Sequence, residues 1–222
     1  ISMQNTLNAT DLIPRSVLFG NPDRMKVRLS SDGRYISFVA PKDGVLNLWV
    51  GPRNEPQKAA PLTDDKKRGI REYLWTYDNR HIVYLQDQDG NENWRLYSLD
   101  IETKEVKNLT PFEGVQARIN QVSRFFPHEI IVSINKRNPE FHDLYRLNVL
   151  TGDLALLEEN NEFAGYVIDD DFNVRFAMRP TTEGGQKMLE KTGKSWTLFA
   201  EIGGEDVMTT TPMGFDKTGT VL

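Results

Sequence analysis

The sequence predicts an all-β protein, a partial β-propeller of about four four-stranded blades plus the start of a fifth. A pattern recurs along the chain: an apolar strand, an Asp-containing turn, a second strand, a Gly-containing turn and a third strand. The clearest copies are 27–51 and 74–100. Equivalent apolar positions in the second strands are Ile36, Ile82, Ile130, Val174 and Val221. Spacings of 44 to 48 residues, with several strands in each repeat, are typical of propeller blades.

The first two predicted blades cover residues 26–63 and 70–110, and their turns carry clear local signals. Ser31-Asp-Gly-Arg separates two strands of the first blade, because Gly and Asp adopt the positive φ that tight hairpin turns need. In the second blade, residues 81–87 and 94–100 alternate apolar and polar side chains, which is the pattern of half-buried strands.

The third and fourth predicted blades cover 118–160 and 165–202, and a further blade begins within 207–222. The third keeps the plan of the second, with Thr151-Gly-Asp as a hairpin turn, whereas the fourth diverges most. Residues 1–25 do not follow the repeat. We expect them to form an N-terminal extension with one short helical turn.

The composition excludes several classes of function. A net charge of -5 and a pI near 5.3 argue against nucleic acid as a partner, because phosphate binding needs a basic face. The apolar stretches have the length of strands, so we expect no membrane partner. Residues 1–10 lack the apolar segment of a signal peptide. The absence of cysteine excludes a disulfide framework and a thiolate metal site, and it fits the cytoplasm and the periplasm equally.

No motif for catalysis or metal binding stands out. Gly193-Lys-Ser-Trp-Thr resembles a nucleophile elbow, but Thr197 replaces the second glycine and a strand, not a helix, is predicted to follow. His81, His128 and His142 fall in different blades, without the spacing of metal ligands. We therefore expect no catalytic residue, no metal site and no cofactor.

The most function-like residues lie in the second blade. Arg71 is expected on an innermost strand, where a charged side chain would border the central channel. Glu92 and Asn93 are expected in a hairpin turn at one face of the disc. We predict that these three residues contact a substrate in the channel, for example by reading the charge of a peptide terminus. A structural ion pair or hydrogen-bonded turn is the alternative.

Several segments resemble a known family of enzymes. Residues 12–22 (LIPRSVLFGNP), 29–41 (LSSDGRYISFVAP) and 46–50 (LNLWV) are similar to the propeller start of bacterial serine peptidases of the prolyl oligopeptidase family. Residues 77–97 match that family's propeller as well. The resemblance covers nearly the whole chain, is strong through Thr110, and is closest to the acylaminoacyl-peptidase and dipeptidyl-peptidase branch.

The resemblance implies a larger propeller followed by an α/β-hydrolase domain with a Ser–Asp–His triad. In that family the propeller caps the active site and admits only short or unfolded peptides. No triad residue can be carried over to this sequence. The resemblance therefore implies a substrate-gating region that is inactive alone, whose partners are peptide substrates and its own hydrolase domain.

Two other interpretations stay open at this stage. A free-standing propeller of the TolB type would bind protein partners, and a small sugar or lactone hydrolase would need convergent acidic or metal-binding residues. The reading frame beyond Leu222 distinguishes the peptidase from the binding module. Further blades and Gly-x-Ser-x-Gly favour the peptidase, and an early stop codon favours the binding module. An unclosed propeller exposes blade edges, so we also expect self-association.

Overall fold

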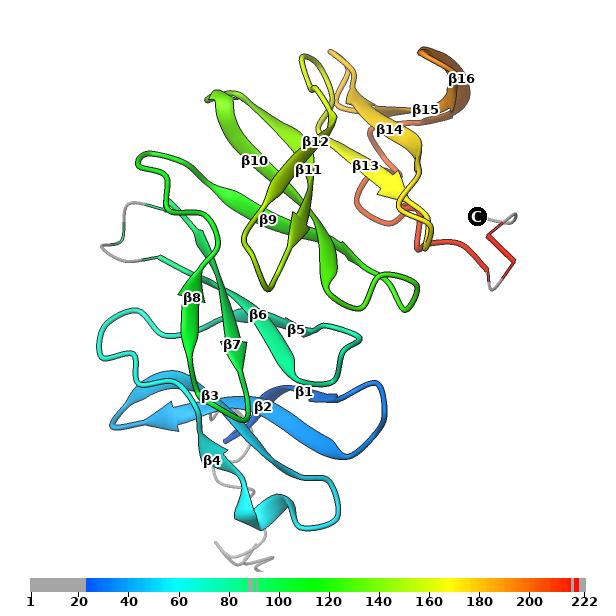
Figure 1. Cartoon of the computed structure of the whole chain (residues 1–222). Coiled ribbons are helices and arrows are strands. Elements are labelled where there is room, and N and C mark those ends of the chain that lie inside the picture. The colour runs from blue at the N-terminus through cyan, green and yellow to red at the C-terminus, as the bar shows by residue number, and fades with distance from the viewer. Residues whose placement is uncertain (1–22, 88–89, 91, 217, 220–222) are drawn as a thin grey trace, which may run out of the picture.

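The computed structural model describes residues 23–87, 90, 92–216, 218 and 219, and within them the strands form four four-stranded antiparallel sheets (Figure 1). The first sheet contains β1 (Met25–Leu29), β2 (Tyr35–Lys42), β3 (Val45–Pro52) and β4 (Ala60–Pro61). The second contains β5 (Glu72–Trp75), β6 (His81–Gln86), β7 (Arg95–Asp100) and β8 (Val106–Asn108). The third contains β9 (Ala117–Val122), β10 (Glu129–Asn138), β11 (Phe141–Asn148) and β12 (Leu154–Glu158). The fourth contains β13 (Gly165–Ile168), β14 (Val174–Pro180), β15 (Gln186–Thr192) and β16 (Ser195–Ile202).

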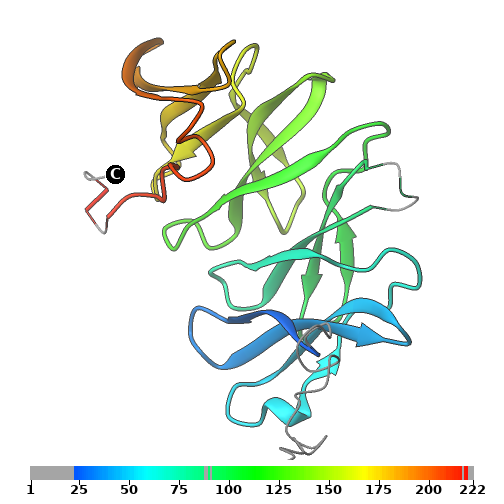
Figure 2. The same ribbon diagram turned by 180° about the vertical axis from the view of Figure 1, so that it is seen from behind.

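The four sheets follow one another along a curved, open row. Figures 1 and 2 both show the first and fourth sheets at opposite ends, with the second and third between them. In every sheet the strands are hydrogen-bonded in chain order, as in a propeller blade. The prediction of an all-β, partial propeller is confirmed.

The core lies between the sheets, because successive residues of a strand point to opposite faces. In β6, Ile82 and Tyr84 pack against the first sheet, whereas Val83 packs against the third. In β10, Ile130 faces the second sheet and Ile131 faces the fourth. Each fully buried aliphatic side chain of this kind stabilises the fold by about 1.5–3 kcal/mol. Both faces of the second and third sheets are therefore buried against neighbouring sheets.

Polar contacts also join the sheets, at the turns that follow β1, β5 and β9. Each of these turns contacts the corresponding turn of the next sheet. The contacts are Ser31 Oγ to Asn79 Oδ1 at 2.6 Å, His128 Nδ1 to Asp78 Oδ2 at 3.3 Å, and Ser123 Oγ to the carbonyl oxygen of Asp170 at 2.5 Å. A repeating side-chain bond thus fixes each sheet to its neighbour.

The far face of the fourth sheet is covered by the segment that follows β16. Phe176 and Met188 pack there with Phe215, whose ring stacks on that of Phe176 with centroids 6.2 Å apart. Among the described residues after Ile202 there is no strand. The expected opening of a fifth blade, and Val221 in particular, continues outside the described residues.

The helical content of the described residues is small. It consists of the short 3-10 helix η2 (Pro56–Lys58) between β3 and β4. Within the described part of the chain, no helix has both the length and the apolar character needed to cross a membrane. The predicted helical turn in residues 1–25 falls almost wholly on 1–22, outside the described residues.

Candidate functional site

Two cavities lie where the first strands of neighbouring sheets begin, and Arg118 borders both. One, of about 290 Å³, lies between the second and third sheets; we call it the Arg71 pocket. Its lining residues are Arg71, Glu72, Leu85, Trp94, Gln116, Ala117 and Arg118. The other, of about 350 Å³, lies between the third and fourth sheets; we call it the His142 pocket.

The Arg71 pocket is lined by both apolar and charged residues. Arg71 directly precedes β5 and is exposed to solvent. Its neighbour Glu72 forms a salt bridge with Lys26 of β1, so the charge of that carboxylate is already balanced. Trp94 is held at the pocket by its backbone, whose carbonyl oxygen accepts a hydrogen bond of 2.8 Å from the N–H of Ala117.

Glu92 and Asn93 lie in the turn before Trp94. Glu92 adopts a left-handed conformation, with a φ of 61°. Its carbonyl oxygen accepts hydrogen bonds from the N–H of Trp94 at 3.0 Å and from Nε2 of Gln116 at 3.1 Å. Asn93 is half-buried beside it. The structure thus brings Arg71 to the same pocket as Trp94, while Glu92 reaches that region through its backbone; contact with a substrate stays a prediction for all three.

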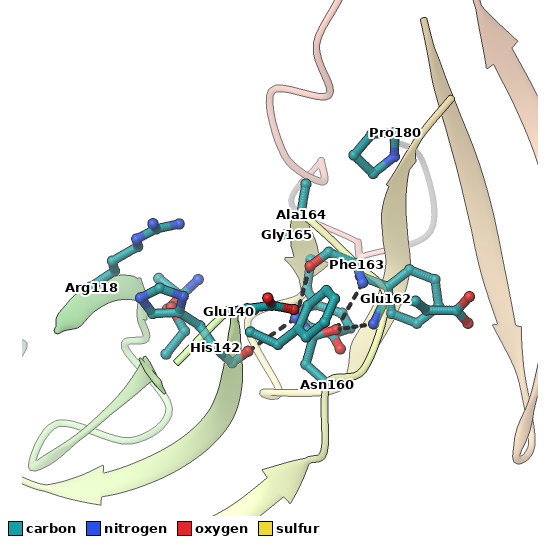
Figure 3. A pocket seen from close by; sticks show the side chains of 13 residues that line it. Arg118, Glu140, His142, Asn160, Glu162, Phe163, Ala164, Gly165 and Pro180 are labelled. Carbon is teal, nitrogen blue, oxygen red and sulfur yellow. Dashed lines mark hydrogen bonds between the residues drawn. The ribbon is translucent and has the colours of Figure 1, made fainter. Parts of the chain in front are cut away.

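The His142 pocket is polar on both sides. Figure 3 shows Arg118 and His142 on one side of the cavity, and Glu162 and Pro180 on the other. Nε2 of His142 lies 3.2 Å from the amide oxygen of Gln116, so the imidazole donates that hydrogen bond. Burial, reinforced by the charge of Arg118, lowers the pKa of His142 to about 4. This side chain is therefore neutral at physiological pH.

Asn160 organises the loop that closes the His142 pocket. Its side-chain oxygen accepts hydrogen bonds from the N–H groups of Glu162 at 3.1 Å and Phe163 at 2.8 Å. Its Nδ2 donates to the carbonyl oxygens of His142 at 3.2 Å and Phe163 at 2.8 Å (Figure 3). One amide side chain thus links β11 to the loop before β13.

Behind this loop lies an ion pair whose carboxylate is buried. The carboxylate of Asp143 accepts two hydrogen bonds from Arg137, at 3.0 and 2.8 Å, and one from the N–H of Asn160 at 2.8 Å. The same guanidinium also donates to the carbonyl oxygen of Asn160 at 2.6 Å. Nothing in the sequence pattern marks Asp143 as the residue that fixes this wall of the pocket.

The structure does not place a nucleophile elbow at Ser195. Gly193, with a φ of 64°, lies in the hairpin turn between β15 and β16, and Ser195 is the first residue of β16. An elbow needs a helix after the serine. The geometry at this position is therefore that of a turn connecting two strands.

Two of the three histidines meet at one carboxylate. Nδ1 of His81 lies 2.5 Å from Oδ2 of Asp78, and Nδ1 of His128 lies 3.3 Å from the same atom. His142 is elsewhere, in its own pocket. Among the residues that the structure describes, no cluster of three His, Asp or Glu side chains could hold a metal ion. His81 and His128 reach the same carboxylate because they lie about one repeat apart in adjacent blades.

Known proteins are similar to this chain in sequence and in fold. No family model matches the chain. Dipeptidyl aminopeptidase BIII of Pseudoxanthomonas mexicana is 40% identical over 223 residues, which cover 100% of this chain and 32% of that protein. Dipeptidyl peptidase family member 6 of Caenorhabditis elegans is 28% identical over 95% of this chain and 30% of its own length. The chain thus spans about a third of these relatives.

Solved structures with the same fold are more distant in sequence. The β-propeller domain of the trilobed protease from Pyrococcus furiosus matches with a TM-score of 0.56 and 18% identity, over 80% of this chain and 56% of that one. Acylaminoacyl peptidase of Pyrococcus horikoshii matches with 0.51 and 17%, over 79% and 32%. TolB of Acinetobacter baumannii matches with 0.53 and 13%, over 80% and 43%. At such identities these likenesses establish the fold alone.

The sheet topology and the fold matches define the class of this molecule as an open β-propeller segment. The sequence match, which covers the whole chain, then narrows this class. The resemblance found in the sequence is confirmed: over its whole length the chain is 40% identical to about a third of a dipeptidyl aminopeptidase, and its fold is that of a protease propeller.

Proposed function

We propose that this chain is the substrate-gating portion of the propeller of a prolyl-oligopeptidase-type serine peptidase, and that it is not catalytic by itself. The single observation that carries the proposal is the 40% identity with a dipeptidyl aminopeptidase along the entire chain. The parent enzyme hydrolyses short peptides at a hydrolase domain encoded elsewhere in its sequence. That domain and the peptides are the partners of this segment.

The gating mechanism is steric and electrostatic. In a propeller the first strand of each blade lines the central channel, and we expect a completed ring to admit peptides through that channel and to exclude folded proteins. Charged groups at the starts of these strands, including Arg71 and Arg118, meet a peptide before it reaches the catalytic serine. Such fixed charges raise the local concentration of ligands with complementary charge.

An activity assay together with the gene tests this function. The chain alone should not turn over dipeptidyl or acyl-peptide substrates above the buffer rate. The reading frame beyond Leu222 should encode further blades and then Gly-x-Ser-x-Gly, and the longer protein should cleave short peptides. Turnover by this chain that disappears when one serine is mutated would overturn the proposal.

A free-standing, TolB-like binding module is the second candidate. The fold match with TolB of Acinetobacter baumannii, at a TM-score of 0.53, is what favours it. Both curated relatives found by sequence are dipeptidyl peptidases, which favours the first proposal. A stop codon shortly after Leu222, combined with capture of a defined protein partner, would reverse this order.

We further propose that the isolated chain self-associates through the open end of its fourth sheet. Phe199 of β16 remains 56% exposed although its ring contacts Phe176, with centroids 5.0 Å apart. Because large exposed aromatic groups on an outer strand favour association, light scattering after size exclusion should show a monomer–dimer equilibrium. Phe199→Glu should shift it to the monomer.

Phe125→Glu is the matched control for this measurement. Phe125 is similarly exposed, at 51%, but lies in the turn between β9 and β10, away from the open end. The control variant should associate like the unmodified chain. A chain that is monomeric at all concentrations, or an equal effect of both variants, contradicts the assignment of the fourth sheet.

A further inference from the structure

Two arginines of the Arg71 pocket lack the partners that most of the other described arginines have. Most of those others form ion pairs with carboxylates, as Arg80 does with Asp100, and others lie over aromatic rings, as Arg124 does over Phe125. Within the described residues, no carboxylate pairs with Arg71 or Arg118 and no aromatic ring lies under either guanidinium. Arg118 has one weak partner, the amide oxygen of Gln116 at 3.3 Å.

Both guanidinium groups border a cavity with an apolar floor. Leu85, Trp94 and Ala117 are the apolar residues of the lining, which we call its floor, and about 290 Å³ is enough for one amino-acid residue of a ligand. Glu72, the acidic residue of the lining, is already engaged by Lys26. The cavity therefore carries excess positive charge beside a surface that favours apolar groups.

Such a lining recognises an anion joined to an apolar group. A carboxylate matches the planar fork of a guanidinium and can accept two parallel hydrogen bonds from it. The apolar floor would at the same time take an aliphatic or aromatic side chain out of water. A neutral peptide segment would use the floor and leave both charges without a partner.

We propose that the Arg71 pocket binds a peptide carboxylate that neighbours an apolar side chain, with Arg71 and Arg118 as the two anion-binding groups. The inference rests on the proposed function, since it assigns a ligand to the channel side of the gate. The carboxylate can be the C-terminus of a peptide or the side chain of an acidic residue. Both present the same chemistry, and the experiment separates them.

Calorimetric titration of this chain with three probes tests the inference. The probes are N-acetyl-Ala-Phe as the free acid, the same peptide as its C-terminal amide, and N-acetyl-Phe-Asp amide. The free acid should bind at least tenfold more tightly than its amide, because a charge-assisted bond is lost in the amide. Tighter binding of the Asp probe than of the free acid would assign the site to acidic side chains, and the reverse order to C-termini.

The variants Arg71→Gln and Arg118→Gln should each weaken binding of the preferred probe about tenfold. Arg53→Gln is the matched control, because Arg53 is an exposed arginine that donates a hydrogen bond of 3.4 Å to Asn54 and lies outside the pocket. It should leave the affinity unchanged, and circular dichroism should show all three variants folded. Added salt should weaken binding of the unmodified chain.

Equal affinity for the free acid and the amide would overturn the inference while leaving peptide handling by the propeller intact. Binding that does not respond to either arginine variant would also overturn it, as would the absence of binding by every probe. Failure of the proposed function is seen separately, in the peptidase activity and the reading frame of the longer protein.

Discussion

Replacing Asp143 with alanine should lower the free energy of unfolding by about 2 kcal/mol, because a buried hydrogen-bonding carboxylate is lost. The side chain is 1% exposed and receives three hydrogen bonds, two from Arg137 and one from the backbone of Asn160. Removing the carboxylate takes the main partner from Arg137, which keeps Glu159 at 3.7 Å and the carbonyl oxygen of Asn160 at 2.6 Å, and it leaves a buried N–H unsatisfied. Both penalties add to the loss of the bonds themselves.

The damage should also reach the His142 pocket. Asn160 holds the loop at residues 162 and 163 through its side chain, and Asp143 holds Asn160 through its backbone. Urea unfolding followed by circular dichroism measures the stability, and amide exchange at Glu162 and Phe163 measures the loop. We expect faster exchange at both positions in Asp143→Ala.

Asp153→Ala is the matched control for this loss. Asp153 lies on the turn after β11, is exposed, and accepts a hydrogen bond of 2.7 Å from the hydroxyl of Thr151. Exposed substitutions of this kind usually change stability by about 0.5 kcal/mol or less. If the two variants lose equal stability, the ion pair of Asp143 does not have the role assigned to it.

Local chemistry explains why the sheets could be predicted from the sequence. The second strand of the second blade was expected at 81–87 and runs over His81–Gln86; the third was expected at 94–100 and runs over Arg95–Asp100. The turns were found because glycine adopts positive φ there, as Gly33 does at 69° and Gly152 at 84°. Period-2 alternation and turn residues are properties of a few adjacent positions, so a single sequence contains them.

Contacts between sheets could not be predicted in the same way. Arg71 was selected for its place on an inner strand, but Arg118, which lines the same cavity, was not. They lie about one repeat apart, and the angle and spacing of adjacent sheets decide whether their side chains share a pocket. The same holds for Asp143 and Asn160, whose partners are fixed by tertiary packing. Aligning the repeats places such residues on adjacent strands, but it does not give their orientation.

The stability that Asp78 provides should disappear in acid. Burial acts to raise the pKa of this carboxyl group, whose side chain is 6% exposed. Hydrogen bonds from the side chains of His81 and Thr76, and from the N–H groups of His81 and Arg80, outweigh it and hold the pKa well below its usual value of 3.8. Since the folded pKa is the lower one, the stabilisation is complete above about pH 4 and is lost as the pH falls toward the folded pKa.

Asp100, a neighbouring carboxylate, should also stabilise the fold less as the pH falls. Hydrogen bonds from the Arg80 guanidinium and from the backbone N–H groups of Glu102 and Thr103 outweigh burial, which acts to raise the pKa, and lower the pKa of Asp100 to about 2. Asp100 also lies 3.8 Å from Nε2 of His81. The unfolding free energy of the chain should therefore decline between pH 4 and pH 2, and the second sheet should contribute to that decline.

Asp78→Asn isolates the contribution of one of these groups. The amide keeps the shape of the turn and an oxygen to accept from Thr76 and Arg80, but it removes the negative charge beside His81 and His128. We expect a loss of about 2 kcal/mol at pH 7 and a shallower decline of stability between pH 4 and pH 2. Urea unfolding at a series of pH values measures both quantities.

The control for the charge is Asp171→Asn, an exposed change in the turn before β14. This variant should follow the unmodified chain across the whole pH range, because substitutions of exposed side chains usually change stability little. The decisive comparison is between the slopes of the unfolding free energy against pH for the two variants and the unmodified chain. If Asp78→Asn declines in acid as steeply as the unmodified chain, the titration of Asp78 is not a source of the acid loss of stability. If its slope is shallower, the titration of this one turn carboxylate accounts for part of the stability that the chain loses in acid.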